Sequence, residues 1–426
     1  MTRATASYVA LLVAAGLSAC SSASQGTDAG ASADASNADA STADSGASDS
    51  GLADAGPADT GAPTPRLEVL DVERPVAVSG DGKTILVWQQ STGALLFYDV
   101  ETRQLSPKTT LDPAGIQTEQ PMAVSSSRRI AASYGFQPTE AALWDEASGW
   151  HKLGSPFPGC VDTSTAPPIP QDRGTAFDLS EDGHVAVGLL WQDCNTVQAF
   201  RWSDATSTGT FQLLDRIGLG PDMQGPSNNR ATVVSSDGRI AAGWAYNVVA
   251  DRSPAIWRAD GTGFLLDPTD TMNPGEITAI SRDGSIAAGF WARPTGGLDG
   301  FVWDQAGGVH RFSKADMADQ SSLFVTAISA DGTWVFGRDR YQLSFFDPAD
   351  DNAFVWSQAK GLRKIADIAA AHGLMPAADL RLASVHAASD DGLVLVGEAQ
   401  LPPLPNDPNM MPVLKVYVLV LPPGAY

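Results

Sequence analysis

The stretch TAISRDGSIAAGFW, at Thr278–Trp291, contains two short apolar segments separated by an Asp-Gly dipeptide. Asp-Gly between two such segments is a strong signal for a β-hairpin. Related stretches occur as DLSEDGHVAVG (Asp178–Gly188), VVSSDGRIAAGW (Val233–Trp244) and AISADGTWVFG (Ala327–Gly337). A hairpin sequence that recurs several times along a chain predicts a repeat architecture, in which each copy belongs to one structural unit.

The repeat covers about residues 66–426 and divides into seven units, each predicted to hold four strands. The first strand ends in serine, the second often ends in glycine, and the third ends in an aromatic residue. The first two strands are joined by Asp81-Gly82, Asp182-Gly183, Asp237-Gly238, Asp283-Gly284, Asp331-Gly332 and Asp391-Gly392, with Ser127-Arg128 in the second unit. The aromatic residues are Tyr98, Trp144, Trp202, Trp257, Trp303, Trp356 and Tyr417.

Each part of the unit has a physical reason. Asp-Gly supplies the positive φ angles that a tight hairpin needs, and the flanking Ser or Asp side chains bond to nearby amides. Small residues such as Ala287-Ala288-Gly289 are expected to let neighbouring sheets approach closely, while the aromatic residue fills the wedge between sheets. One unit cannot bury its own apolar faces, whereas seven units around an axis can, and closing the ring removes exposed sheet edges.

The two ends of the repeat region bear on closure. The seventh unit stops at Tyr426, soon after its third strand, and Arg66–Asp71 reads like the fourth strands at Phe211–Asp215 and Gly263–Asp267. We therefore expect an all-β fold over residues 65–426, a seven-bladed β-propeller closed by an N-terminal strand. Six or eight blades and an open solenoid are the alternatives.

The N-terminus, MTRATASYVALLVAAGLSAC, has one basic residue before an apolar run that is too short to be a permanent membrane span. It ends in Leu-Ser-Ala-Cys and resembles the lipobox of bacterial lipoproteins. The resemblance implies a signal peptide over residues 1–19 and lipid attachment at Cys20. The alternative is an ordinary secretory signal. Ser21 after the cysteine favours the outer membrane or cell surface over the inner membrane.

Residues 20–64 have a composition that cannot form a packed core. Aspartates fall five residues apart from Asp34 to Asp59, among Ala, Ser, Gly and Thr. We expect the lipidated cysteine to be followed by a disordered tether rather than by a calcium site, because no fixed backbone would gather the carboxylates. Lipid and tether together place the folded region at the bacterial cell envelope, anchored to a membrane.

Charge and composition exclude several functions. The chain of 426 residues carries a net charge of −22, and −16 remains when Arg3 and the seven aspartates of the tether are removed. Nucleic acid is therefore excluded as a partner, because nothing would neutralise its phosphates. The five histidines have no metal-ligand spacing, and neither a GxSxG elbow nor a phosphate loop is present. We expect a monomer with no metal and no cofactor.

The repeats resemble the HAF-type extracellular repeats of bacterial exported proteins, whose short signature is His-Ala-Phe. Here the signature lacks its histidine, as Gln198-Ala199-Phe200 and Asn352-Ala353-Phe354. The resemblance covers nearly all of residues 66–426 and implies a β-propeller-like fold. It implies no catalytic residue.

The long connections of the predicted sheets all fall on one face, opposite the Asp-Gly turns. They are Gly154–Arg173, Asp215–Arg230, Arg338–Asp351, Ala366–Ala383 and Glu398–Pro412. Long loops on one rim of a rigid scaffold commonly carry function. Cys160 and Cys194 lie on this face, and we expect a disulfide between them, with two free thiols as the alternative.

Three aromatic residues end successive second strands near the same face. Trp191, Trp244 and Trp291 could form a platform for sugars or aromatic ligands, although their registers differ and packing between blades is the alternative reading.

We expect a non-catalytic binding module that recognises an envelope protein or a glycan. The alternatives are a secreted hydrolase or lyase acting on glycan, with carboxylates such as Glu181, Glu276 and Glu398 converging at the axis, and a purely structural envelope protein.

Overall fold

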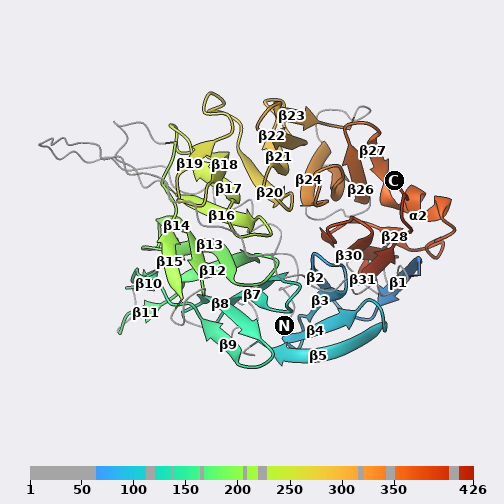
Figure 1. Ribbon diagram of the computed structural model, residues 1–426, viewed down its shortest axis with the longest axis horizontal. Helices are drawn as coiled ribbons and strands as arrows, with labels where there is room; N and C mark the ends of the chain where they lie inside the picture. Colours follow the sequence, from blue (N-terminus) through green and yellow to red (C-terminus); the bar gives the residue numbers. More distant parts are fainter. Residues whose placement is uncertain are drawn as a thin grey trace, which may run out of the picture. The chain divides into compact units, whose positions relative to one another are not determined.

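The computed structural model describes residues 64–111, 120–135, 138–163, 167–204, 209–218, 228–314, 321–341, 351–402 and 412–426, all within one compact unit, Pro63–Tyr426 (Figure 1). The predicted signal peptide, Cys20 and the predicted tether up to residue 63 lie outside the described residues. Lipidation and anchoring therefore remain predictions.

Antiparallel strands in groups of four build the described region, as the repeat predicts. In chain order, the first four groups are β2 (Arg74–Val78), β3 (Thr84–Gln89), β4 (Ala94–Asp99), β5 (Gln104–Thr110); β6 (Gln120–Val124), β7 (Ile130–Tyr134), β8 (Glu140–Asp145), β9 (Gly149–Lys152); β12 (Gly174–Leu179), β13 (Val185–Trp191), β14 (Val197–Ser203), β15 (Thr210–Leu213); and β16 (Asn229–Val234), β17 (Ala241–Tyr246), β18 (Arg252–Trp257), β19 (Gly263–Leu265).

The next two groups share one sheet through a single parallel pair, Leu298 with Ser322. Their strands are β20 (Gly275–Ile280), β21 (Ile286–Ala292), β22 (Leu298–Asp304), β23 (Gly308–Phe312), and β24 (Ser321–Ile328), β25 (Val335–Tyr341), β26 (Asn352–Ser357), β27 (Gly361–Lys364). The last group contains β28 (Arg381–Leu382), β29 (Ala387–Ala388), β30 (Val394–Leu401) and β31 (Val413–Val420).

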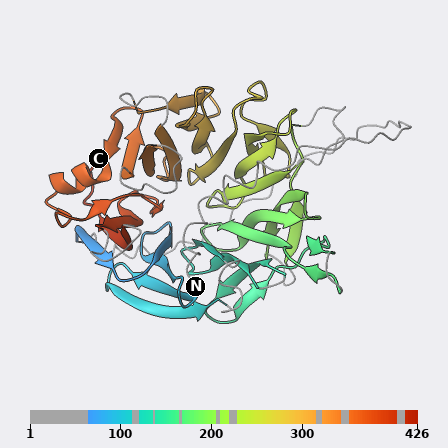
Figure 2. The ribbon, with the colours of Figure 1, turned by 180° about the vertical axis from the view of Figure 1, so that it is seen from behind.

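The N-terminal strand β1 (Arg66–Leu70) completes this last group, as the sequence predicts. It runs antiparallel to β31, with Arg66 opposite Val420 and Leu70 opposite Val416. Both views of the ribbon show β1 beside the C-terminal strands (Figure 2). The two ends of the repeat region therefore belong to one sheet.

The turn of the opening stretch shows how Ser-X-Asp-Gly works. Ser281 Oγ donates to Asp283 Oδ1 at 2.8 Å and accepts from the Ile286 N–H at 2.9 Å. Asp283 Oδ1 also accepts from the Ser285 N–H at 2.9 Å. Gly284 has a φ of 74°. The expectation that both turn residues take positive φ is thus wrong for aspartate, which acts through its carboxylate.

The second unit, which lacks Asp-Gly, keeps the same backbone conformation. Arg128 has a φ of 63° and donates its N–H to Ser125 O at 2.9 Å, as the turn glycines do elsewhere. A non-glycine residue in this region is unfavourable, so the surrounding units impose the turn.

A chain of hydrogen bonds joins these turns from one unit to the next. In six of the seven turns the residue after the serine donates its N–H to the carbonyl of the matching residue in the following unit, and the last unit bonds to the first. The donor–acceptor distances are 2.7–3.2 Å for Ser126 to Glu181, Glu181 to Ser236, Ser236 to Arg282, Arg282 to Ala330, Ala330 to Asp390 and Asp390 to Gly80. Asp81 N donates to Ser126 Oγ at 3.3 Å, which returns the chain of bonds to the second unit.

The glycine near the end of the second strand is explained within its own sheet. The first strand has a β-bulge, which in β20 lies between Ile277 and Ala279. A Cβ added at Gly289 would come closer than 3.0 Å to the Glu276 carbonyl oxygen. The close approach is thus to the adjacent strand's backbone, not to a neighbouring sheet as expected. The same clash would occur at Gly188, Gly243, Gly337 and Gly397.

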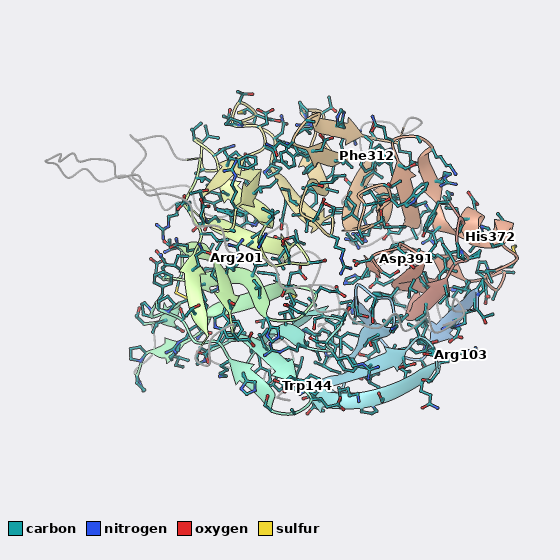
Figure 3. The ribbon with its side chains drawn as sticks, in the orientation of Figure 1. Arg103, Trp144, Arg201, Phe312, His372 and Asp391 are labelled. Carbon is teal, nitrogen blue, oxygen red and sulfur yellow. A yellow bond between two sulfur atoms is a disulfide. The ribbon has the colours of Figure 1, made fainter. Side chains whose placement is uncertain are left out.

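The aromatic residues of the third strands pack between units, as predicted, but to different depths. Tyr98, Trp144, Trp257 and Tyr417 are buried, whereas Trp202, Trp303 and Trp356 are half-buried. The rings of Phe312 on β23 and Trp356 on β26 are stacked with centroids 4.2 Å apart, and Phe312 is labelled in Figure 3. These contacts join one group of strands to the next.

Two of the predicted loops contain regular structure. Ile365–Ala371 forms the helix α2, with Ile365, Ile368 and Ala369 buried. This spacing of three and four residues is a helix signal, so the expectation of an irregular loop at Ala366–Ala383 is wrong there. In Gly154–Arg173, β10 (Val161–Asp162) pairs with β11 (Ile169–Pro170).

Candidate functional site

The two ends of the sheets differ in how they use their polar side chains. We call the end with the Asp-Gly turns the turn end and the opposite end, where the first strands begin, the loop end. At the turn end the aspartates accept hydrogen bonds from their own turns. Asp391, labelled in Figure 3, accepts from Ser389 Oγ at 2.5 Å and from the Leu393 N–H at 2.9 Å.

At the loop end, seven cross-strand pairs near the start of the first strands form what we call the inner belt. Paired residues on antiparallel strands present their side chains to the same face. Six are register pairs: Arg74 with Trp88, Gln120 with Ser133, Thr175 with Leu189, Arg230 with Trp244, Glu276 with Phe290, and Phe324 with Arg338. The seventh is Ser384 with Glu398, where the Ser384 N–H donates to Glu398 O at 3.4 Å.

One part of the inner belt is a buried ion pair surrounded by aromatic rings. Arg230 contacts Glu276 at 2.5 Å, and both side chains are less than a tenth exposed. Thr232 Oγ1 donates to Glu276 Oε1 at 2.7 Å. The Arg230 guanidinium also lies 5.0 Å from the centroid of the Phe177 ring. A buried ion pair of this kind links neighbouring sheets.

The structure places two of the three predicted tryptophans in one cluster. Trp191 and Trp244 belong to a hydrophobic cluster with Phe177 and Tyr246. Trp244 is buried, and the Arg252 guanidinium lies 4.6 Å from its ring centroid. Trp191 is half-buried and remains accessible to a ligand.

Trp291 lies apart from these two. It is fully buried in another cluster, where Nε1 donates to Asn273 O at 2.7 Å. Its ring packs edge-on against Phe301, with centroids 5.5 Å apart. The three tryptophans are therefore not brought together on one platform.

A second part of the inner belt gathers charged groups that the sequence analysis did not single out. Arg74 on β2 contacts Glu398 on β30 at 3.1 Å. His386, just before β29, is near enough to Arg74, Arg338 and Glu398 for all three charges to act on its pKa. The side chain of His386 keeps contact with solvent, although protein surrounds much of it, and this enclosure lowers its pKa. The ionisable side chains of these four residues, which belong to three units, therefore lie near one another.

The carboxylates considered for catalysis lie in three different places. Glu276 pairs with Arg230 and Glu398 with Arg74, whereas Glu181 accepts from Ser126 Oγ at the turn end. Within the described ranges, no three His, Cys, Asp or Glu residues are arranged to hold a metal ion. No helix in the described part of the chain is long and apolar enough to cross a membrane.

Asp178 departs from the repeat pattern, and this departure is visible in the sequence alone. Two residues before the turn serine, the other units have Ala77, Ala123, Val233, Ala279, Ala327 and Ala387. Asp178 accepts hydrogen bonds from the N–H groups of Leu179 and of Val234 in the next unit, both at 2.8 Å. Burial raises the pKa of its carboxyl to about 7.

This raised pKa gives a pH-dependent stability. The unfolded chain ionises Asp178 near its ordinary pKa of 3.8, whereas the folded chain keeps the proton up to about 7, so folding loses stability as pH rises through this window. The free energy of unfolding of Asp178→Ala, measured relative to the wild type, should therefore be about 2–3 kcal/mol higher at pH 8 than at pH 5. Urea unfolding at the two pH values measures this difference.

Asp283→Ala is the control, because hydrogen bonds from Ser285 lower the pKa of Asp283. Its effect on stability should be equal at pH 5 and pH 8. If Asp178→Ala also showed an equal effect at both values, Asp178 would not titrate in this range.

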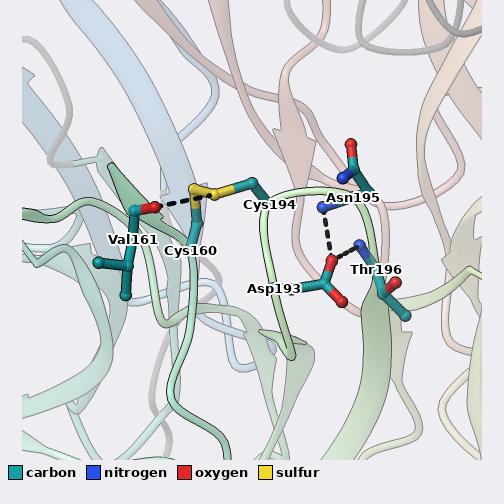
Figure 4. The surroundings of a disulfide bond; sticks show 6 residues. All are labelled: Cys160, Val161, Asp193, Cys194, Asn195 and Thr196. Carbon is teal, nitrogen blue, oxygen red and sulfur yellow. Dashed lines mark hydrogen bonds between the residues drawn. A yellow bond between two sulfur atoms is a disulfide. The ribbon is translucent and has the colours of Figure 1, made fainter. Parts of the chain in front are cut away.

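The predicted disulfide is present at the loop end (Figure 4). Cys160, in the connection after β9, is bonded to Cys194, in the loop after β13, across 34 residues of sequence. Asp193 beside it accepts hydrogen bonds from the N–H groups of Asn195 and Thr196 at 2.7 and 2.9 Å. The disulfide links the connection between the second and third units to a loop of the third unit.

We expect Cys160→Ser with Cys194→Ser to lower the free energy of unfolding by about 2–3 kcal/mol, because the unfolded chain loses a cross-link. Chemical denaturation of the oxidised protein and the double variant measures the difference. Alkylation of the wild type without reduction should label neither cysteine, and labelling of both would contradict the pairing.

A cavity of ≈ 690 Å³ lies beside the sixth group of strands and α2. Its lining includes Trp356, Arg363 and Ile368, with Lys314 and Asp339 in contact at 2.8 Å. It is separate from the inner belt.

Comparison with known proteins identifies no family. No family model matches the chain, and no characterised protein matches its sequence. The β-propeller domain of Cps50 (Swd1) from Myceliophteria thermophila is similar in structure, with 12% identity, 84% of this chain and 100% of that chain covered, and a TM-score of 0.49. The β-propeller domain of the trilobed protease from Pyrococcus furiosus has 9% identity, covers 84% and 94%, and has a TM-score of 0.47.

TolB from Acinetobacter baumannii has 14% identity and a TM-score of 0.40. The match covers 64% of this chain and 60% of TolB, so the chain spans less than two thirds of that protein. With TM-scores below 0.5, none of these likenesses assigns a function.

Proposed function

We propose that residues 65–426 form a closed seven-bladed β-propeller of HAF-like repeats. The chain of hydrogen bonds between turns supports closure, because Asp390 in the last unit donates to Gly80 in the first. The contacts between first strands support it as well, since β2, β6, β12, β16, β20, β24 and β29 touch in this order and β29 touches β2. The pairing of β1 with β31 joins the ends of the chain in one blade.

We infer that this propeller is a non-catalytic binding module whose loop end recognises an envelope protein or a glycan. The observation that carries the proposal is where exposed apolar side chains lie. Met272 and Met375, exposed by 78% and 69%, and Val249, exposed by 54%, all lie on connections of the loop end. The exposed apolar residues on strands, such as Val69 at 44%, are less exposed than these three. Loops at one end of a rigid scaffold commonly carry binding.

We propose further that Cys20 is lipidated and that the tether holds the module at the outer membrane or cell surface. The Leu-Ser-Ala-Cys sequence and the composition of residues 20–64 support this. Cys20→Ala should move the protein from the detergent phase to the aqueous phase of a cell extract. Equal partitioning of both proteins would contradict lipid anchoring.

Capture from envelope extracts and a glycan array test the binding function together. Val249→Ser with Met272→Ser should reduce capture at least about tenfold, because apolar anchors contribute strongly to interfaces. Leu105→Ser with Leu213→Ser is the matched control, since these residues are 37% and 38% exposed on fourth strands. Equal loss in both variants would contradict a loop-end surface.

The alternatives give other outcomes. Cleavage of an arrayed glycan would indicate a hydrolase or lyase, and the absence of any partner would favour a structural role.

A further inference from the structure

We propose that the inner belt between the sixth, seventh and first units is a binding site for a single carboxylate group attached to a ring or other flat apolar body. The Arg338 guanidinium holds the carboxylate, and Phe324 and Phe290 contact the apolar body. The site goes beyond the proposed recognition of an envelope partner and does not depend on which macromolecule the loops bind.

Arg338 is the first reason. Within the described part of the chain, its guanidinium has neither a hydrogen bond nor an ion pair, and its charged contact is with the Phe324 ring, 4.9 Å from the centroid. The side chain is half-buried, and the surrounding protein lowers its pKa, yet a guanidinium stays charged in proteins. A half-buried guanidinium loses part of its hydration, and a carboxylate ligand would satisfy its paired N–H groups.

The neighbouring charges cannot replace such a ligand. Glu398 acts on Arg338 at longer range, but its carboxylate contacts Arg74 at 3.1 Å. Asp351 also acts on Arg338, and it contacts Arg340 at 3.2 Å. Within the described ranges, the two carboxylates that act on Arg338 thus already contact other arginines.

The charge count favours a monoanion. Arg74 and Arg338 carry two positive charges, Glu398 carries one negative charge, and the lowered pKa of His386 keeps that ring neutral near pH 7. Among these four described groups one positive charge is left over, in a chain whose net charge is −22. A local cation in an acidic protein indicates a specific counter-ion rather than general attraction.

The aromatic wall defines the rest of the ligand. Phe290 and Phe324 are half-buried, with ring centroids 5.9 Å apart, and come from adjacent units. Flat apolar groups pack well against such rings. His386, whose charge environment includes Arg338, is exposed to solvent. The geometry therefore fits a ring-bearing carboxylate better than a small hydrated anion.

His386 provides a direct readout on the full-length protein. Its imidazole is followed by NMR with labelled histidine and assigned with His386→Asn, while benzoate, acetate and phosphate are added separately. Benzoate should raise the pKa of His386 by about 0.5 unit or more in a saturable way, because it cancels the charge of Arg338. Acetate and phosphate should bind at least about tenfold more weakly.

Three variants test the assignments. Arg338→Gln should abolish the response to benzoate, and Arg338→Lys, which keeps the charge but not the planar fork, should weaken it. Phe324→Leu should weaken benzoate binding and leave acetate unchanged. Arg258→Gln is the matched control, because Arg258 is an exposed arginine 5.0 Å from the Phe264 ring centroid, and it should respond as the wild type does.

Several results would overturn the proposal. They are the absence of a saturable shift in the wild type, an unchanged response in Arg338→Lys and Phe324→Leu, or phosphate binding as tightly as benzoate, which would indicate a general anion site. None of these results depends on capture of an envelope partner, so failure here leaves the proposed function standing.

Discussion

Deletion of Arg66–Leu70 is expected to lower the melting temperature by roughly 10 °C and to promote association of the protein. The deletion removes the strand that covers β31, whose residues Val416 to Val420 are fully buried. An uncovered edge strand with apolar residues pairs readily with other chains. Loss of five backbone pairings and their packing amounts to several kcal/mol, which gives a shift of this size in a large domain.

The deletion also separates the first unit from the last. Tyr98 on β4 donates its hydroxyl proton to Glu68 Oε2 at 2.6 Å, and Arg66 contacts Glu68 at 2.9 Å. Thermal unfolding followed by circular dichroism, together with size-exclusion chromatography, measures both effects. Deletion of residues 40–44 in the predicted tether is the control and should leave the melting temperature within about 1 °C. A stable monomer without β1 would contradict the role of this strand.

Much of the strand plan could be predicted from the sequence because its signals are local. The turn serine, aspartate and glycine of the stretch at Thr278–Trp291 all lie within a few residues, and they form the hydrogen bonds that the motif requires. The pairing of Arg66–Leu70 with the last unit was also predictable, because the repeat shows which strand is missing. Because the other units each have four strands, they show which strand the last unit lacks, without any knowledge of long-range contacts.

The bulge in the first strand could not be predicted in this way. The bulge depends on how β20 and β21 are paired. Its signal in the sequence is a glycine, and a glycine is equally compatible with close packing of neighbouring sheets. Gly289 was therefore expected to face a neighbouring sheet, whereas its close neighbour is the Glu276 backbone. In the first two units, where Pro75 and Pro121 occupy the bulged strand, the same position carries Val87 and Ala132. This contrast was visible in the sequence and could have indicated a role within the sheet.

The candidate site was predictable only where topology alone brings residues together. Cys160 and Cys194 lie on connections at the same end of a predicted sheet, and they are bonded. Arg338 and His386, by contrast, belong to different units, and nothing near them in the sequence marks them as neighbours. Their convergence depends on the order of the units around the inner belt, which a repeat pattern does not specify at the level of single side chains.

Gly289→Ala is expected to lower the free energy of unfolding by about 4 kcal/mol, near the upper end for a single substitution. The added Cβ would come closer than 3.0 Å to the Glu276 carbonyl oxygen, which is backbone and cannot rotate away. Relief requires β20 and β21 to separate, and Glu276 is also the partner of Arg230. The strain would therefore spread to the inner belt.

Urea unfolding of wild type and variant measures the loss, with Gly149→Ala as the control. Gly149 has a φ of 76° and no atom within 4 Å of an added Cβ, so alanine there meets only the backbone cost of about 1 kcal/mol. The contrast between the two variants isolates the clash. An equal effect at both positions would show that β20 shifts freely, and the bulge would then not explain why the second strand needs glycine.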